Sequence, residues 1–179
     1  MRPVPASSVF AIRDLVLAYA DLVGAGDVEG VAELFAHGEL SATGNPRVAR
    51  GRDEVRETYT ATLGAPGSER PHIHNVTTNL IIDVDDQDAT ATCRSYFSVV
   101  RERSPAALGV SIAGRYEDRF HRVDGTWRFA RRHIIIDLMG NAGDLLAGVA
   151  ALSEAADAAL SEAAGAALPE RAESANRPD

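Results

Sequence analysis

The sequence predicts an α+β fold in which N-terminal helices pack on an antiparallel sheet. Up to residue 64, apolar residues recur at the spacing of amphipathic helices, and from residue 72 the pattern changes to the alternation of β-strands. The clearest local signal lies in residues 111–137, where the turn Val123-Asp124-Gly125-Thr126 joins two extended runs. An Asp-Gly turn between such runs is typical of a β-hairpin. We therefore expect the other elements to pack around this hairpin.

Three helices are expected before the strands begin. The first is capped by Ser7 or Ser8 and carries Tyr19 on its apolar face, and the second is capped by Asp27. The third runs over residues 53–63 and ends at a glycine- and proline-containing stretch. Between the second and third helices, a small hairpin is expected at residues 39–43 and 47–50.

Four long strands are expected at residues 72–84, 89–103, 109–122 and 126–138. Strict alternation along the first of them puts His74 on the same apolar row as Leu80 and Val84, and puts Asn75 on the opposite face. In the second strand, one row is small and apolar, which suits the wall of a pocket. This row contains Ala91, Cys93, Ser95, Phe97 and Val99.

Alternation in the central hairpin groups Tyr116 with Asp118 and Phe120 on one face. In the following strand it separates Phe129 from Arg132. The end of that strand is apolar on both faces, as is usual for a strand that is covered on both sides. We therefore expect helices on one face of the sheet and a second subunit or layer on the other.

Composition excludes several classes of function. The net charge of −8 argues against nucleic-acid binding, and all 18 basic residues are Arg, so no lysine is available for Schiff-base chemistry. The single Cys93 forms no internal disulfide, and no Cys/His spacing for zinc occurs. No apolar run approaches the roughly 18 residues of a membrane span. We expect a cytoplasmic protein that does not bind a membrane and uses neither a metal nor a cofactor.

The two ends of the chain are expected to lie outside the α+β domain. Residues 1–7 are expected to be flexible, and residues 169–179 form a polar tail. Between residues 141 and 168 an alanine-rich stretch has apolar residues at helical intervals, which predicts an extra C-terminal helix. This helix either lies over the open end of the sheet or pairs with a helix of a partner.

Three stretches resemble the SnoaL-like branch of the nuclear transport factor 2-like superfamily. They are AIRDLVLAYADLVGAGDVEGVAELFA, HNVTTNLIIDVDDQDATATCRSYF and GRYEDRFHRVDGTWRFARRHIIID, in this order. The resemblance covers residues 8–140 and implies a cone-shaped α+β barrel, in which a curved antiparallel sheet wraps around the helices and forms a deep apolar cavity. It also implies a small hydrophobic ligand and a homodimer formed through the outer face of the sheet.

The dehydratases of this branch use a Tyr and an Asp on the first helix, a His at the start of the first long strand, and an acid or His on the next strand. By this resemblance the Tyr falls on Tyr19 and the His on His74. The helix Asp falls on Gly24, and the group on the second strand falls near Val99. A shift of a few residues would recruit Asp21, or alternatively Asp27, as the acid.

The expected catalytic residues are therefore His74, Tyr19, Tyr116 and Asp21. An imidazole with an ordinary pKa of about 6.5 exchanges protons at neutral pH. A tyrosine hydroxyl can donate to a substrate carbonyl and stabilise an enolate. The structural alternative is that His74 is a core histidine bonded to a backbone carbonyl and that Tyr19 is a core aromatic.

Further residues are expected to line the pocket. For Arg132, binding of an anionic or carbonyl group competes with an ion pair, and Asp118 either replaces the missing acid, pairs with an Arg or lies in solvent. His133 and Asp137 do not suffice for a metal site. The expected wall consists of Phe35, Tyr59, Phe97, Val99, Arg132, Ile134 and Ile136.

Two functions are compatible with this pattern. The first is a cofactor-free acid/base lyase or isomerase, similar to a dehydratase or polyketide cyclase, that acts on a small hydrophobic carbonyl compound such as a polyketide, steroid or terpenoid intermediate. The second is a non-catalytic module of the same fold that binds a small ligand or mediates dimerisation.

Overall fold

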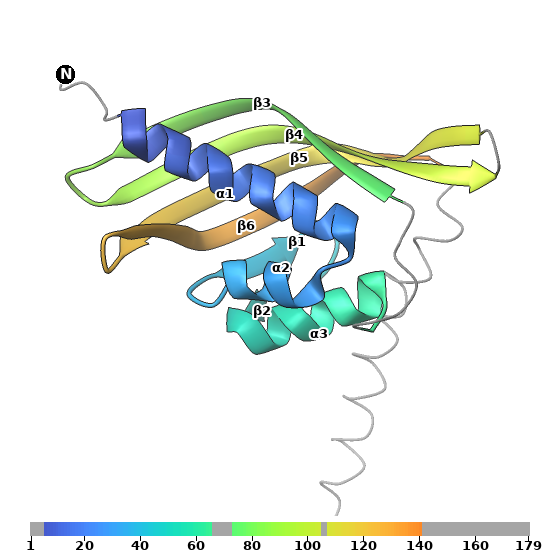
Figure 1. Ribbon diagram of the computed structural model, residues 1–179, viewed down its shortest axis with the longest axis horizontal. Coiled ribbons are helices and arrows are strands. Elements are labelled where there is room, and N and C mark those ends of the chain that lie inside the picture. The colour runs from blue at the N-terminus through green and yellow to red at the C-terminus, as the bar shows by residue number, and fades with distance from the viewer. Residues whose placement is uncertain (1–5, 66–72, 105–106, 141–179) are drawn as a thin grey trace, which may run out of the picture.

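A curved sheet of six strands, with three helices beside it, makes up the part of the chain that the structure describes (Figure 1). The structure is a computed structural model, and it describes residues 6–65, 73–104 and 107–140. The strand order is β2-β1-β6-β5-β4-β3, and the sheet does not close into a barrel. The predicted α+β class is confirmed. The elements are α1 (Ala6–Ala25), α2 (Val28–Leu34), β1 (Glu39–Ala42), β2 (Ala49–Arg50), α3 (Gly51–Leu63), β3 (Ile73–Asp85), β4 (Thr90–Ser104), β5 (Ala107–Val123) and β6 (Thr126–Met139).

Some predicted segments cannot be compared with the structure. The expected C-terminal helix at residues 141–168 and the tail at residues 169–179 lie outside the described residues. So do residues 1–5, whereas residues 6 and 7, which were expected to be flexible, already belong to α1.

The helices bury the faces that their sequences predict. In α1, Ile12, Val16 and Tyr19 are at most 2% exposed and belong to the same core cluster as the buried residues of the sheet, as their helical spacing predicts. Asp27 caps α2 by accepting a hydrogen bond from the backbone N–H of Gly30 at 2.9 Å. In Figure 1, α2 and α3 lie beside each other at the end of the sheet where β1 and β2 are found. The helices therefore leave the other face of the sheet uncovered among the described residues.

The central hairpin forms as predicted. Asp124 and Gly125 have φ angles of 49° and 77°, the left-handed pair that a tight two-residue turn requires. The small hairpin of β1 and β2 also forms, with Glu39 opposite Arg50. Its pairing with the rest of the sheet was not predicted: β1 runs parallel to β6, from Glu39 opposite Arg131 onward.

A bulge in β3 changes which side chains face the interior. Asn79 adopts a φ of 55°, and the pairing with β4 shifts between Thr78 and Ile81. An extra residue reverses the alternation beyond it. Asn75 therefore faces the interior, whereas His74 is exposed on the outer face. The prediction that His74 shares an inward row with Leu80 and Val84 is wrong for this reason.

A second bulge lies in β6. Arg131 pairs with Arg119 and Phe129 pairs with Phe120, so Ala130 is the extra residue. Phe129 and Arg132 consequently both face inward, and each is fully buried. The prediction that these two residues lie on opposite faces is wrong. The inward rows predicted for β4 and for Tyr116, Asp118 and Phe120 in β5 are confirmed.

We predict that Asn79→Val destabilises the fold, because a β-branched side chain tolerates positive φ poorly. The expected loss in the free energy of unfolding is about 1–2 kcal/mol, measured by urea denaturation. Asn79→Gly should stay within about 0.5 kcal/mol of the parent. Thr78→Val, at the exposed neighbouring position, is the control. Equal stability of the two valine variants would contradict the role given to the bulge.

Candidate functional site

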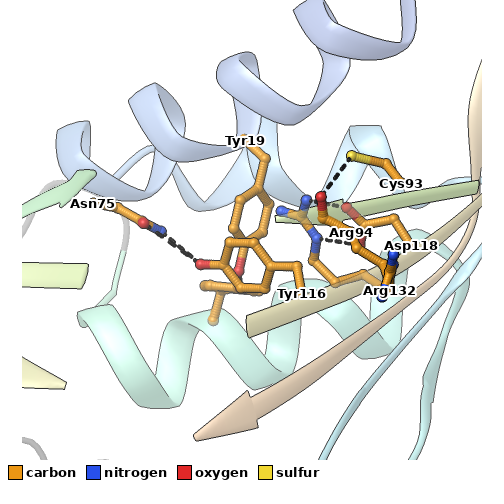
Figure 2. A network of polar contacts seen from close by, with 8 residues as sticks. Tyr19, Asn75, Cys93, Arg94, Tyr116, Asp118 and Arg132 are labelled. Atoms are coloured by element: carbon orange, nitrogen blue, oxygen red, sulfur yellow. Dashed lines mark hydrogen bonds and ion pairs between the residues drawn. The ribbon is translucent and has the colours of Figure 1, made fainter. Parts of the chain in front are cut away.

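Three tyrosines and an asparagine converge in the interior from four different elements. Tyr19 comes from α1, Tyr59 from α3, Tyr116 from β5 and Asn75 from β3. The hydroxyl groups of Tyr19 and Tyr59 form a short hydrogen bond, and Asn75 Nδ2 donates to Tyr116 Oη at 3.0 Å. Figure 2 shows Asn75 and Tyr116 pointing toward each other, with Tyr19 projecting beside them. We call these four residues the tyrosine cluster.

A buried ion pair lies next to the tyrosine cluster. Arg132 Nε and Nη2 donate to the two carboxylate oxygens of Asp118 at 2.8 and 2.6 Å, and both side chains are fully buried (Figure 2). The Arg132 guanidinium carbon also lies 4.0 Å from the ring centre of Tyr19 and 4.1 Å from that of Tyr116. Such distances allow a cation–π interaction with both rings.

The ion pair keeps a permanent cation beside the phenols. Burial opposes the charge of Arg132, but the adjacent Asp118 carboxylate outweighs it and raises the pKa of the guanidinium. Because the pairing uses Nε and Nη2 in a bidentate geometry, it also fixes the orientation of the guanidinium plane. The Asp118 side chain is thus engaged as the partner of Arg132, one of the outcomes expected from the sequence.

Two phenols of the cluster, Tyr59 and Tyr116, keep their protons at neutral pH. Burial, followed by the neighbouring Tyr19, raises the pKa of Tyr59 well above its usual value of 10.0. Burial is also the main cause that raises the pKa of Tyr116. Both hydroxyls therefore keep their protons at neutral pH and are poor general bases.

Aromatic rings surround the cluster. Phe97 stacks on Tyr116 with ring centres 4.3 Å apart, and Phe35 meets Tyr19 edge-on at 6.2 Å. The stacking of Phe97 on Tyr116 requires glycine at position 114. A Cβ there would lie 2.0 Å from the carbonyl oxygen of Ile135 and 3.0 Å from the Phe97 ring. The walls of the site are thus apolar, with polar groups at a few fixed points.

Three further polar atoms on the inward rows have unused hydrogen-bonding capacity. Arg132 Nη1, Ser95 Oγ and Thr77 Oγ1 are buried and have no hydrogen-bond partner among the described residues. Buried polar groups are normally paired, with protein, water or ligand. These atoms add to the capacity of the site to bind oxygen atoms of a ligand.

The structure brings together only part of the predicted catalytic set. Tyr19 and Tyr116 are each 2% exposed and lie in the cluster. His74 and Asp21 are exposed, so the predicted placement of His74 on an inward row is wrong, and Asp21 does not point toward the cluster. Asp21 lies on the solvent side of α1, because it does not share the helical spacing of Val16, Tyr19 and Val23.

The predicted wall residues lie inside or against the core. Ile134 and Ile136 are partly buried against it, whereas the other five are buried: Phe35, Tyr59, Phe97, Val99 and Arg132. The two positions onto which the sequence resemblance places an acid or imidazole group are occupied by Gly24 and the buried, apolar Val99. Asp27 is occupied as the cap of α2.

Other reactive side chains offer little further chemistry. Burial raises the pKa of the Cys93 thiol to about 12, so the nucleophilic thiolate is not formed at neutral pH. His133 lies between two hydroxyls, with Ser41 Oγ 2.9 Å from Nδ1 and Thr43 Oγ1 3.3 Å from Nε2. Within residues 6–65, 73–104 and 107–140, no group of three or more metal-ligating side chains is placed to hold an ion.

Sequence reasoning missed Asn75 and the central position of the ion pair. Both errors come from bulges, and one of them leaves a trace in the sequence: Asn79 interrupts an otherwise β-branched and apolar run, and Asn tolerates the left-handed region better than other non-glycine residues. In β6, Ala130 carries no comparable signal.

The helices of the described chain are too short or too polar to span a membrane.

An open curved sheet with helices on its inner face is the fold of the nuclear transport factor 2-like superfamily, and the solved structure of an NTF2-like protein matches most of the chain. Within it the chain belongs to the SnoaL-like family, since the model of the SnoaL-like domain matches residues 6–133. The resemblance seen in the sequence is thereby confirmed. No curated protein matches the sequence.

Several solved structures are similar over most of the chain. One is a variant of Rv3472 from Mycobacterium tuberculosis, a protein of unknown function (28% identity, TM-score 0.68, 84% of this chain and 89% of that chain). Another is an NTF2-like protein with a cystatin-like fold from Novosphingobium aromaticivorans (28% identity, TM-score 0.59, 76% of this chain and 86% of that chain). A third, from the same organism, is described as a candidate scytalone dehydratase (25% identity, TM-score 0.62, 75% of this chain and 87% of that chain).

We predict that Asp118→Asn strongly destabilises the protein, because it leaves the buried Arg132 cation without its counter-ion. The expected loss is about 3–5 kcal/mol in the free energy of unfolding, measured by urea denaturation. Asp137→Asn removes an exposed partner from Arg115 and should cost far less. The double variant Asp118→Leu/Arg132→Met should recover much of the loss. Similar effects of the two Asn variants would refute the importance of the buried pair.

We also predict that the cluster makes stability decrease at high pH. The folded pKa of Tyr59 lies above that of an unfolded phenol, about 10, so its contribution is complete below that pH and is lost as the pH rises further. In a Cys93→Ala background, which removes the thiol that shifts in the same direction, urea denaturation from about pH 8 to 11 should show a shallower decline for Tyr59→Phe. An unchanged slope would contradict the shift.

Proposed function

We propose that the protein binds a small hydrophobic molecule through a carbonyl or hydroxyl oxygen at the tyrosine cluster. The observation that carries this proposal is the convergence of Tyr19, Tyr59, Tyr116 and Asn75 beside Arg132 in an aromatic interior. Ligand sites are typically apolar with a few placed polar groups, and this arrangement has that composition.

The hydrogen-bond pattern supports recognition of an acceptor oxygen. Tyr116 Oη accepts from Asn75 Nδ2 at 3.0 Å, and its own proton is directed to Asn75 Oδ1 in a longer contact of 3.5 Å, which a better-placed ligand oxygen would replace. In the Tyr19–Tyr59 pair, one hydroxyl donates to the other, and the accepting phenol keeps a free proton. One phenolic proton of the Tyr19–Tyr59 pair is thus available to a carbonyl oxygen, and the Tyr116 proton joins it by giving up its long contact with Asn75. Phe97 and Phe35 provide apolar contact for the carbon skeleton of the ligand.

A cofactor-free lyase or isomerase is the second candidate. The cation of Arg132 beside donating phenols would favour negative charge on a bound oxygen, as an enolate intermediate requires. The similarity to a candidate scytalone dehydratase supports the same class. Such a reaction also needs a proton acceptor, and the two residues predicted for this task, His74 and Asp21, are exposed. Binding alone is therefore the function that the described residues support best.

The position of Gly24 is relevant to this choice. A Cβ at Gly24 would lie 3.6 Å from the carbonyl oxygen of Ile73 and 4.0 Å from the backbone nitrogen of Asn75, which are ordinary contacts. Space does not forbid a side chain at the position where related dehydratases carry their Asp.

We predict that 2-acetylnaphthalene, an apolar aromatic ketone, binds to the full chain and that Tyr116→Phe weakens binding about tenfold, equivalent to one hydrogen bond of roughly 1–1.5 kcal/mol. Isothermal titration calorimetry measures the affinity. Tyr96→Phe is the matched control, because Tyr96 is 53% exposed and lies on the outer face of the sheet. Equal losses in both variants, or none in Tyr116→Phe, would exclude the cluster as the ketone site.

The same ketone separates the two functions. Exchange of its α-protons with deuterium, followed by NMR, reports proton abstraction next to the carbonyl. A binding protein should leave the exchange rate at its value in buffer. Acceleration that requires Tyr116 would instead establish enolisation and select the lyase or isomerase. His74→Ala should affect neither measurement, since His74 is exposed.

A further inference from the structure

The face of the sheet that points away from α1 carries exposed apolar side chains on four neighbouring strands. Val76, Tyr96, Val110 and Leu138 are 45%, 53%, 53% and 68% exposed. We call these four residues the outer patch. Exposed apolar groups that gather on one face usually mark a surface that something covers.

The strand register shows that the outer patch is continuous. Val76 pairs with Ser98, Ser98 with Ala113, and Ala113 with Leu138, so one row crosses β3, β4, β5 and β6. Val110 pairs with Val100 in the adjacent row, and Tyr96 lies in the row on the other side. With strands about 4.8 Å apart, the row is roughly 14 Å wide.

The chain leaves the sheet at this patch. Gly140, the last described residue, donates its N–H to the carbonyl oxygen of Ser111 at 2.8 Å. A Cβ on Gly140 would lie 2.5 Å from the carbonyl oxygen of Val110, so the backbone passes in close contact with a patch residue. The described chain therefore ends beside Val110, at the residue that follows Leu138 and Met139.

The following sequence matches what the patch needs. Residues 141–168 carry apolar side chains at helical intervals, chiefly Leu145, Val149, Leu152, Ala156 and Leu160. A helix of about 12 residues is roughly 18 Å long, enough to cross the row. From Gly140 the chain needs only five residues to reach Leu145, a span of up to about 17 Å.

We propose that residues 141–168 form an amphipathic helix that docks its apolar stripe on the outer patch of the same chain. Covalent attachment beside Val110 gives this segment a high effective concentration at the patch, whereas a second copy of the chain must be recruited from solution. The small Ala side chains of the stripe allow a helix to approach the sheet closely. This proposal is independent of the proposed ligand.

Paramagnetic relaxation in the full chain tests the docking. A nitroxide is attached at Ser153→Cys, next to Leu152, while Cys93, at 1% exposure, stays unlabelled. We expect loss of the amide signals of Val76, Tyr96 and Val110, with recovery when the nitroxide is reduced. Val110→Asp or Leu138→Asp should abolish the loss. Thr92→Asp, exposed at the far end of β4, should leave it unchanged.

Two further measurements identify the occupant. Nitroxide-labelled chains are mixed with isotope-labelled chains that carry no nitroxide, and light scattering gives the mass. Docking within one chain is supported when signals are lost only in chains that carry both the nitroxide and the isotope label. Signal loss in the mixed sample with a doubled mass means that a second copy covers the patch, and this overturns the proposal. Absence of signal loss in the doubly labelled chain also overturns it.

Discussion

The buried pair of Arg132 and Asp118 is the interaction on which the interior depends. Two charges removed from water are stable only when each satisfies the other, and here two short hydrogen bonds join neighbouring strands β5 and β6 through their side chains. The guanidinium then serves as a platform for the rings of Tyr19 and Tyr116, which belong to a helix and a strand. The ion pair thus lies between α1 and the sheet and contacts a tyrosine ring from each of them.

Much of the fold follows from local signals. The helical spacing around Tyr19, the cap at Asp27 and the Asp124-Gly125 turn each specify their element through short-range chemistry, so the sequence was sufficient to predict them. The parallel pairing of β1 with β6 depends on contacts between residues about ninety positions apart, for which no local pattern exists. The inward tyrosines were predictable because helix and strand periodicity are unbroken around them.

The site was harder to predict because its composition depends on two bulges. A single extra residue reverses every side chain beyond it, so a correct list of strands still gave a wrong interior at His74 and Asn75. The same effect hid the common orientation of Phe129 and Arg132. The charge of Arg132 also made its burial hard to predict. A fully buried arginine is rare and is expected only when a carboxylate such as Asp118 is known to lie opposite it. The site therefore combines the neutral donors of the tyrosine cluster with the neighbouring Arg132 cation, and His74, the base first assigned to it, lies outside.

The bulge at Asn79 has an evolutionary consequence. A deletion of one residue between His74 and the bulge, with the bulge retained, would rotate the beginning of β3 by half a turn about its axis and exchange an amide for an imidazole in the lining of the interior. Sheets of this kind can therefore gain or lose a proton-transfer group by a length change rather than by substitution. Comparisons within the SnoaL-like family that align residues without regard to strand phase will assign reactive groups to the wrong side of the sheet.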